Sequence, residues 1–239
     1  MRNLAVDIGN TAIKYALFEG EVLACSGQAT DEEQLLADSR LAGADHLIVA
    51  SVRAGQSMLL EKLPVPGLRL ALSHETPVPV VNRYLTPHTL GADRLAAVVG
   101  ASHLFPGTDC LVIDAGTCIT VDFVDGNKNY HGGSIGLGLE MKFRALHTFT
   151  QKLPLLQRSP EAVPLAGRNT AGAMQSGVLN GTLAELNGLI SAYRSTSPDL
   201  VVVLCGGDAA FFETNLKAPI FVVPELVLIG LNRILNYNV

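Results

Sequence analysis

The sequence contains two copies of one strand–turn–strand pattern, and this repeat constrains the fold more than any other feature. In the first copy, an apolar strand leads into the turn DIGNT at residues 7–11, and apolar and polar residues then alternate as in a second strand. In the second copy, the apolar residues 111–113 lead into DAGT at residues 114–117, and alternation follows again. Solenoid repeats have much shorter periods than the distance between the turns at residues 7 and 114. A repeat of that length indicates a duplicated domain.

Helix and strand patterns alternate after each copy, which is typical of an α/β fold. In the first half, the sequence TDEE at residues 30–33 predicts a capped helix to about Leu41. Strands are predicted at residues 46–50, 68–72, 200–205 and 220–223, and helices near 56–63, at 139–149 and 170–193, and from Pro224 onward. The proline-containing stretches 77–79 and 154–164 predict irregular loops. A boundary near residues 106–107 gives two predicted domains, 1–107 and 108–239.

Composition and charge exclude several classes of protein. With 48% hydrophobic residues, the 239-residue chain can bury a large core. Its net charge is −5, so it offers no excess of positive charge to a nucleic acid backbone. Asp7 lies where the apolar core of a signal peptide would be, and no apolar run approaches the ~20 residues that a membrane helix needs. We therefore expect a cytoplasmic protein that binds neither nucleic acid nor a membrane.

Cysteines and histidines do not indicate a metal site. The four cysteines, Cys25, Cys110, Cys118 and Cys205, lie singly in or beside apolar runs without a CxxC pair, and we expect them to be buried, reduced thiols. The six histidines, His46, His74, His88, His103, His131 and His147, are scattered without ligand spacing. His131 precedes Gly132-Gly133 closely enough to approach a ligand, but a structural role is favoured.

The first turn has the residue types of a phosphate site. Asp7 ends an apolar strand, and Gly9 lets the backbone approach a phosphate closely, so that amide hydrogens and the side chains of Asn10 and Thr11 can bind its oxygens. Asp7 can hold magnesium, directly or through water, because this cation prefers carboxylate and phosphate oxygens. Lys14 adds a positive charge nearby. Alone, the pattern is equally compatible with a plain β-hairpin; the second copy makes that alternative much weaker.

The second turn and a later glycine pair extend this interpretation. Thr117 offers a hydroxyl near the position that Asn10 has in the first copy, so the two turns together predict a phosphate clamp. Residues 205–208 (CGGD) follow a buried strand and precede a helix, which suits a surface on which an adenosine lies close to the backbone.

A further segment, GADR at residues 91–94, has the groups that a kinase needs to bind and activate the substrate that accepts the phosphoryl group. Asp93 at a helix start is placed to take the proton of an acceptor hydroxyl, and Arg94 offers a planar, charged fork for a substrate carboxylate. A structural alternative remains open, in which Asp93 only complements the helix dipole and Arg94 is a solvated first-turn residue.

The two phosphate turns and the CGGD corner, in this order, resemble the nucleotide-binding fold of sugar kinases, actin and heat-shock chaperones, in which duplicated ribonuclease-H-like domains enclose an ATP cleft. The whole chain resembles the type III pantothenate kinase family. The resemblance rests on the DIGNT start, Tyr84 seven residues before Gly91-Ala92-Asp93-Arg94, the DAGT turn at residues 114–117, and Gly132-Gly133 on the following strand.

The resemblance implies a homodimeric enzyme that phosphorylates pantothenate with ATP and magnesium, at the first step of coenzyme A biosynthesis. The residues that it implies for ATP are Asp7, Ile8, Gly9, Asn10, Thr11, Ala12, Ile13 and Lys14, together with Thr117. Those that it implies for pantothenate are Tyr84, Gly91, Ala92, Asp93 as proton acceptor, Arg94, and Thr170 contributed across the dimer interface. Asp114 is implied to hold the potassium or ammonium ion that the family requires.

Two departures and two alternative functions accompany this resemblance. Gly136-Leu137-Gly138 replaces the usual Pro-Gly, and Cys118 replaces a smaller residue. A non-enzymatic ATP-binding regulator would need neither the Asp93-Arg94 pair nor the cation-holding Asp114. A sugar or acetate kinase would share the phosphate turns but has no reason to place GADR between them.

Overall fold

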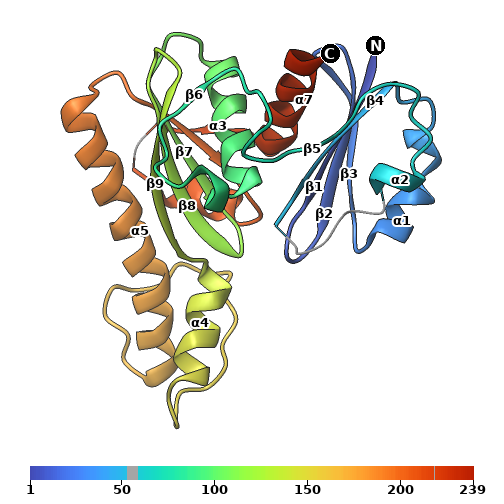
Figure 1. Ribbon diagram of the computed structural model, residues 1–239. Coiled ribbons are helices and arrows are strands. Elements are labelled where there is room, and N and C mark those ends of the chain that lie inside the picture. Colours follow the sequence, from blue (N-terminus) through green and yellow to red (C-terminus); the bar gives the residue numbers. More distant parts are fainter. Residues whose placement is uncertain (53–58, 218) are drawn as a thin grey trace. The chain divides into compact units, whose positions relative to one another are not determined.

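The computed structural model describes residues 1–52, 59–217 and 219–239, which form two sheets with helices (Figure 1). The first sheet has the order β3-β2-β1-β4-β5. Its strands are β1 (Arg2–Ile8), β2 (Ile13–Glu19), β3 (Val22–Ala29), β4 (His46–Ser51) and β5 (Arg69–Ala71). β1 pairs antiparallel with β2 and parallel with β4, and β4 pairs parallel with β5.

The second sheet has the order β11-β10-β7-β8-β9-β6. Its strands are β6 (Val81–Asn82), β7 (Cys110–Ala115), β8 (Cys118–Val124), β9 (Asn129–Leu137), β10 (Val201–Cys205) and β11 (Phe221–Val222). Without β6, the strands follow the same spatial order as in the first sheet, with β7 in the place of β1. Both copies of the repeat thus form equivalent hairpins, and the predicted duplicated α/β fold is confirmed.

The helices are α1 (Glu32–Leu36), α2 (Leu59–Lys62), α3 (Ala92–Leu104), α4 (Leu139–Thr148), α5 (Thr170–Thr196), α6 (Ala209–Asn215) and α7 (Leu226–Asn238). Short 3₁₀ turns cover Ser39–Leu41 and Pro87–Thr89. Among the described helices, none combines the length and the apolar character needed to cross a membrane.

The chain packs as two compact units. One comprises Met1–Cys110, Asp122–Gly132 and Glu225–Val239, and the other comprises Leu111–Val121 and Gly133–Pro224. We call them the first and the second unit. The division into sequence domains 1–107 and 108–239 stays a prediction, since it concerns the ancestral duplication rather than packing.

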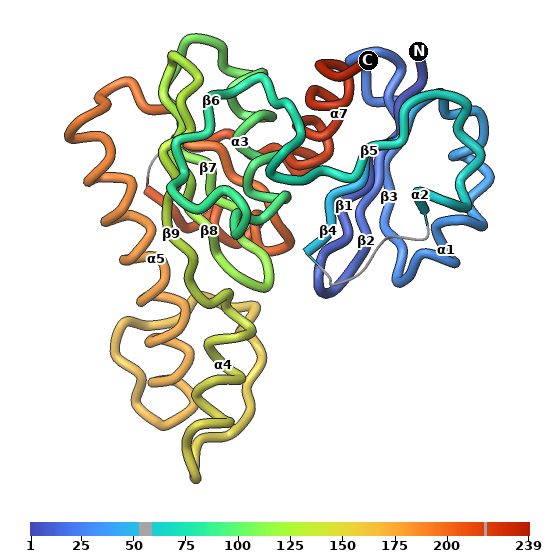
Figure 2. Tube along the Cα trace, viewed as in Figure 1, coloured from blue at the N-terminus to red at the C-terminus, as the bar shows by residue number. Residues whose placement is uncertain are grey.

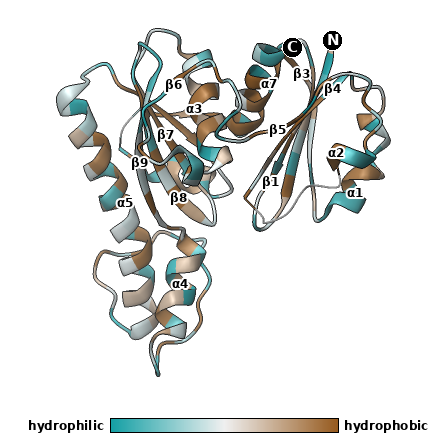
Figure 3. Ribbon diagram, viewed as in Figure 1, coloured by the Kyte–Doolittle hydropathy of each residue, from teal (hydrophilic) through white to brown (hydrophobic). Residues whose placement is uncertain are grey.

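In the first unit, helices α3 and α7 pack closely together, and both are rich in apolar residues (Figures 1 and 3). Two glycines allow this approach. A Cβ atom on Gly230 would lie 1.8 Å from the carbonyl oxygen of Ala96, and one on Gly100 would lie 2.5 Å from the carbonyl oxygen of Leu226. Both carbonyl oxygens belong to the backbone, so a clash with an added Cβ could be relieved only if the helices moved apart.

Replacing Gly230 with alanine should therefore lower the free energy of unfolding by about 1–3 kcal/mol, the usual cost of overpacking. Gly188 on α5 is the matched control, because a Cβ there would meet no atom within 4 Å. Alanine at Gly188 should leave stability unchanged or raise it through its better helix propensity. Urea unfolding of both variants measures the difference, and equal midpoints would contradict the close packing of α3 on α7.

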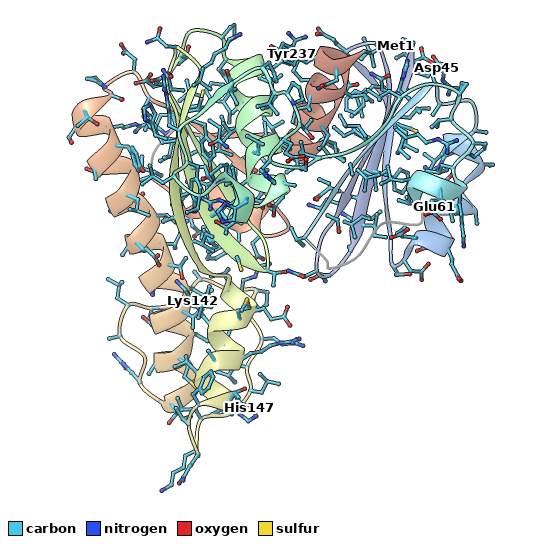
Figure 4. The ribbon with its side chains drawn as sticks, viewed as in Figure 1. Met1, Asp45, Glu61, Lys142, His147 and Tyr237 are labelled. Carbon is cyan, nitrogen blue, oxygen red and sulfur yellow. The ribbon has the colours of Figure 1, made fainter. Side chains whose placement is uncertain are left out.

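In the second unit, α4 and α5 lie side by side, and the irregular segment between them folds back along α5 (Figure 2). Lys142 reaches from α4 to α5, where its Nζ donates to Thr182 Oγ1 at 2.8 Å and contacts Glu185 Oε2 at 3.0 Å (Figure 4). Ser176 Oγ donates to the carbonyl oxygen of Leu165 at 2.6 Å and so ties the segment to the helix. The predicted irregular loop at residues 154–164 is confirmed.

The first predicted helix differs from its observed form. Asp31, not Thr30, is the N-cap and accepts a hydrogen bond from Gln34 N at 2.8 Å. The helix ends at Leu36 because Asp38 caps a separate 3₁₀ turn by accepting from Arg40 N at 3.0 Å. A side chain that caps a new turn competes with continuation of the helix. Of the helix predicted near 56–63, residues 56–58 lie outside the described residues.

The cysteine prediction is half correct. All four thiols are free, and Cys110 and Cys205 are buried, but Cys25 and Cys118 are only half-buried. Burial raises the pKa of Cys110 to about 12, so this thiol stays protonated at neutral pH.

Candidate active site

The turn after β1 lies in the first unit and exposes several polar groups. Asp7 is the second-last residue of β1 and pairs in register with Lys14 on β2. Gly9 N donates to the carbonyl oxygen of Ala12 at 3.1 Å and closes the turn. Asn10 and Thr11 are exposed at its tip, while Asp7 and Lys14 are half-buried. This arrangement suits an anionic ligand, with a carboxylate for a cation beside it.

Not every residue of this segment can offer its side chain to a ligand. Ile8 and Ile13 flank the turn, and both side chains are buried in the apolar core of the unit. Their predicted contact with ATP is therefore possible only through backbone atoms.

The GADR segment forms the start of α3, also in the first unit. Gly91 is the N-cap residue, and Asp93 lies in the first turn, where its Oδ1 accepts a hydrogen bond from Arg94 N at 2.8 Å. A Cβ atom on Gly91 would lie 2.4 Å from Asp93 Oδ1. The carboxylate thus lies directly over the glycine, and any side chain at position 91 would displace it.

A cavity of about 400 Å³ in the first unit lies beside the start of α3. On one side it is lined by Ser51, which pairs in register with Ile8 at the end of β1. On the other side it is lined by Gly91 and Ala92, next to the Asp93 carboxylate. The end of β4 and the start of α3 therefore border one space.

Arg94 is not a solvated residue, and its fork is already engaged within the chain. Its Nε donates to Asp122 Oδ2 at 3.0 Å, and its Nη2 donates to Asp122 Oδ1 at 2.5 Å. The structural alternative of a solvated Arg94 is thus wrong. The expected bond to a substrate carboxylate cannot use this edge of the guanidinium, although the prediction that Arg94 lines the substrate site stays untouched.

Asp122 and Tyr130 were not among the predicted site residues. Tyr130 Oη donates to Asp122 Oδ1 at 2.7 Å, and the Tyr84 ring stacks near Tyr130 with 6.3 Å between the ring centres. Burial, reinforced by the nearby Asp122 charge, raises the pKa of Tyr130. One signal pointed to Asp122: an acid in the apolar strand sequence TVDFV needs a cationic partner when it is buried.

The adjoining hairpin settles the position of His131. Its Nε2 lies 2.9 Å from Asp125 Oδ2, and its ring packs against Phe123 with 5.6 Å between centres. Burial opposes ionisation of Asp125, but hydrogen bonds from His131 and Asn129 lower its pKa to about 2. The predicted structural role of His131 is consistent with these contacts.

The second turn lies in the second unit. Asp114 is the second-last residue of β7, and Gly116 N donates to the carbonyl oxygen of Cys118 at 3.0 Å. Gly206 has a φ of +94°, and a Cβ there would lie 2.5 Å from Asp114 Oδ1. The Asp114 carboxylate thus lies against a glycine corner with room for no side chain, which fits a site for a small cation that needs oxygen ligands.

The departure at residues 136–138 keeps the glycine that the geometry requires. Gly138 N donates to the carbonyl oxygen of Thr117 at 3.0 Å. A Cβ on Gly138 would lie 2.2 Å from the carbonyl oxygen of Gly116 and 2.4 Å from that of Thr117. The second turn therefore keeps its close approach to the backbone at Gly138 without the usual proline.

A cavity of about 340 Å³ in the second unit lies at the predicted adenosine corner. It is lined by Asp208, Arg158 and apolar residues that include Phe143. Arg158 Nη1 lies 3.5 Å from Asp208 Oδ1, and its guanidinium lies over the Phe211 ring at 5.1 Å. Burial raises the pKa of Asp208, although Arg158 acts in the opposite direction. Arg158 was not among the predicted site residues, because it lies in an irregular loop without a recognisable pattern.

Thr170 is the first residue of α5 and is exposed. Asn169 caps the helix by accepting from Gly172 N at 2.7 Å. Gly167 is required just before it, because a Cβ there would lie 2.1 Å from Ala173 N. Thr170 is therefore exposed at a tightly packed helix start, and its contact with pantothenate stays a prediction.

In the described part of the chain, no three acidic, histidine or cysteine side chains gather into a metal site. A cation at Asp7 or Asp114 would therefore also need oxygen ligands from phosphate, backbone or water.

Comparisons with known proteins agree with this geometry. A family model described as type III pantothenate kinase matches residues 3–192. The type III pantothenate kinase of Phocaeicola vulgatus is 45% identical over 240 residues, covering 99% of this chain and 98% of that protein. A candidate Baf family transcriptional activator from Campylobacter jejuni is similar in structure, with a TM-score of 0.64, 21% identity and 98% of both chains covered.

A candidate 2-dehydro-3-deoxygalactonokinase from Sinorhizobium meliloti is also similar, with a TM-score of 0.63, 16% identity and 99% of both chains covered. At these identities the two structures establish the fold alone. Together with the repeated strand order, they confirm duplicated ribonuclease-H-like domains of the actin-like and sugar-kinase type. Family membership rests on the family model and the curated relative: the chain belongs to the type III pantothenate kinase family.

Proposed function

We propose that this chain is an ATP-dependent pantothenate kinase, which produces 4'-phosphopantothenate and ADP in the first step of coenzyme A biosynthesis. The family match over residues 3–192 carries this proposal. The cavity lined by Gly91 and Ala92, next to the Asp93 carboxylate, supports it, because phosphoryl transfer needs an acceptor base beside the space that holds the acceptor.

In the proposed reaction, Asp93 accepts the proton of the pantothenate hydroxyl. The hydroxyl oxygen bonds to the γ-phosphorus while the bond to the β,γ-bridging oxygen breaks, and ADP leaves with that electron pair. Gly91 leaves the space that Asp93 Oδ1 occupies, so the base is held at the start of α3. Tyr84, Gly91, Ala92 and Arg94 position the acceptor.

ATP is bound by the segment from Asp7 to Lys14 and by Thr117. Asn10, Thr11 and the Gly9 backbone supply hydrogen bonds to phosphate oxygens, and Lys14 supplies positive charge. Magnesium, held at Asp7 directly or through water, would balance the charge of the phosphate oxygens. The Arg158–Asp208 cavity receives the adenosine end, as the glycine corner at residues 206–207 suggests.

The proposal also includes the assembly, location, domain origin and cation site that the family resemblance implies. The enzyme is a homodimer located in the cytoplasm, Thr170 completes the pantothenate site of the partner subunit, and the domains 1–107 and 108–239 arose by duplication. Asp114 holds a potassium or ammonium ion near the ATP phosphates, where the ion offsets their mutual repulsion.

Activity should therefore rise with added potassium or ammonium and respond little to sodium. An Asp114→Asn variant keeps the size of the side chain but removes its charge, so it should lose most of the potassium response while its melting temperature changes little. Initial rates at fixed magnesium, with the three chlorides compared at equal ionic strength, measure the effect. Equal rates in sodium and potassium would remove the cation from the proposal.

The proposed function is tested by coupled ADP release with pantothenate, glucose, N-acetylglucosamine, acetate or no acceptor. We expect release above background with pantothenate alone. Release with a sugar or with acetate instead would support the sugar or acetate kinase alternative, and no acceptor-dependent release would favour the regulator.

A further inference from the structure

A buried carboxylate lies beneath the acceptor segment and has no part in the proposed reaction. Asp122 on β8 is 1% exposed, and its partners Arg94 and Tyr130 are 6% and 0% exposed. Its two oxygens accept hydrogen bonds from Arg94 Nε at 3.0 Å, Arg94 Nη2 at 2.5 Å and Tyr130 Oη at 2.7 Å. All three residues belong to the first unit.

These contacts fix Arg94 in one orientation. A planar guanidinium that binds both oxygens of a carboxylate is held in position and in plane. Within the protein, an unpaired charge of either sign would be strongly unfavourable, so neither partner can leave the other without cost. Tyr130 uses its hydroxyl to hold the carboxylate from a second direction.

Two groups expected to touch the acceptor depend on Arg94. The backbone N–H of Arg94 donates to Asp93 Oδ1 at 2.8 Å, and the guanidinium lies over the Tyr84 ring at 5.7 Å. The Tyr84 ring also stacks near Tyr130 and packs against Gly132, where a Cβ would lie 3.0 Å from Tyr84 Cδ2. The orientation of the Arg94 guanidinium therefore affects Tyr84, and the anchoring of Arg94 holds the helix start whose backbone N–H binds Asp93.

We propose that Asp122 is a positioning residue for the acceptor: through the Arg94 side chain it orients Tyr84 and anchors the start of α3 that carries Asp93, and it neutralises the Arg94 charge beneath the site. Tyr130 assists by holding the Asp122 carboxylate. This inference rests on the proposed function, since it concerns how the pantothenate site is built. It assigns no contact between Asp122 and either substrate.

The test replaces Asp122 with asparagine, which keeps the shape and removes the charge. The KM for pantothenate should rise about tenfold or more and kcat should fall, while the KM for ATP stays within about twofold, because a 1 Å misplacement at a reacting group costs up to ~10²-fold. Calorimetric titration with pantothenate should show the same weakening without turnover. Asp125→Asn is the matched control on the same hairpin, and both constants should stay near wild type.

A double-variant cycle tests whether Asp122 acts through Arg94. In an Arg94→Gln background, adding Asp122→Asn should cost less than about twofold further, since the partner is already gone. A full additional loss in that background would overturn the proposal, because Asp122 would then act by another route. A purely structural role predicts a smaller active fraction and an unchanged KM for pantothenate, which would also overturn it.

If Asp122→Asn does not fold, Tyr130→Phe gives the decision. It removes one hydrogen bond to the carboxylate and keeps the ion pair, so the KM for pantothenate should rise about two- to fivefold with an unchanged KM for ATP. No change in a folded Tyr130→Phe enzyme would count against the inference. Failure of the proposed function is recognised separately, because the wild-type enzyme would then show no pantothenate-dependent turnover.

Discussion

Replacing Asp93 with asparagine should lower kcat by ~10²-fold or more, because the variant keeps the size of the side chain but cannot accept the proton of the acceptor hydroxyl. The Asp93 carboxylate lies over Gly91 and accepts from Arg94 N, and an asparagine side-chain oxygen can make the same bond. Folding and ATP binding should therefore persist. Steady-state rates and the KM for ATP measure the outcome.

The control for this variant is Glu33→Gln, which changes an exposed first-turn acid of α1. If Asp93 served only the helix dipole, both variants would lose a few tenths of a kcal/mol in stability and neither would lose turnover. Near-normal turnover of a folded Asp93→Asn enzyme would remove Asp93 from the role of base.

Mixing two inactive variants should restore about a quarter of wild-type activity if the site is shared across a two-fold dimer. Asp93→Ala removes the base, and Thr170→Arg fills the position expected to contact pantothenate in the partner subunit. Random pairing makes about half of the dimers mixed, and each mixed dimer has one site with both residues intact and one with neither.

The measurement is the activity of the co-expressed or co-refolded mixture. Mixed dimers isolated from it by two different affinity tags should show about half of wild-type activity, because one of their two sites is intact. Each variant alone is the control, because neither homodimer contains an intact site. Mixed dimers that form but stay inactive would show that Thr170 acts within its own subunit or not at all.

The local sequence was sufficient to predict the turns and most elements. Asp7 and Asp114 each lie near the end of an apolar strand before a glycine, and this short-range pattern predicts a strand, a turn and an acid beside the turn at once. The equivalent strand orders of the two sheets confirm that the repeat was interpreted correctly. The start of α5 at Thr170 was also predicted, and the structure shows Asn169 as its N-cap.

Interactions between distant residues were not predictable in this way. Arg94 looked like a solvated first-turn residue or a substrate fork, and only the packing of α3 against β8 brings Asp122 to it. Arg158 reaches Asp208 from an irregular loop that has no periodicity to analyse. Such pairs depend on tertiary structure, which a pattern of neighbours in sequence does not contain.

Small errors arose where two local solutions compete. Asp31 and Thr30 are both good capping residues, and the contact with Gln34 N decides for Asp31. Cys25 lies on β3, an edge strand of the first sheet, and Cys118 begins β8 directly after the second turn, and burial is incomplete at both. Sequence patterns fix the type of an element better than its first residue or the exposure of a single side chain.

The central claim is that this chain moves the γ-phosphoryl group of ATP to the pantothenate hydroxyl. It is tested most directly by incubating the purified enzyme with γ-labelled ATP, magnesium, potassium and pantothenate. The products are then separated, identified and quantified by mass spectrometry. We expect the label in 4'-phosphopantothenate, with one ADP formed for each labelled product. Label that remains in ATP, or that appears only as inorganic phosphate while pantothenate is unchanged, would contradict the claim.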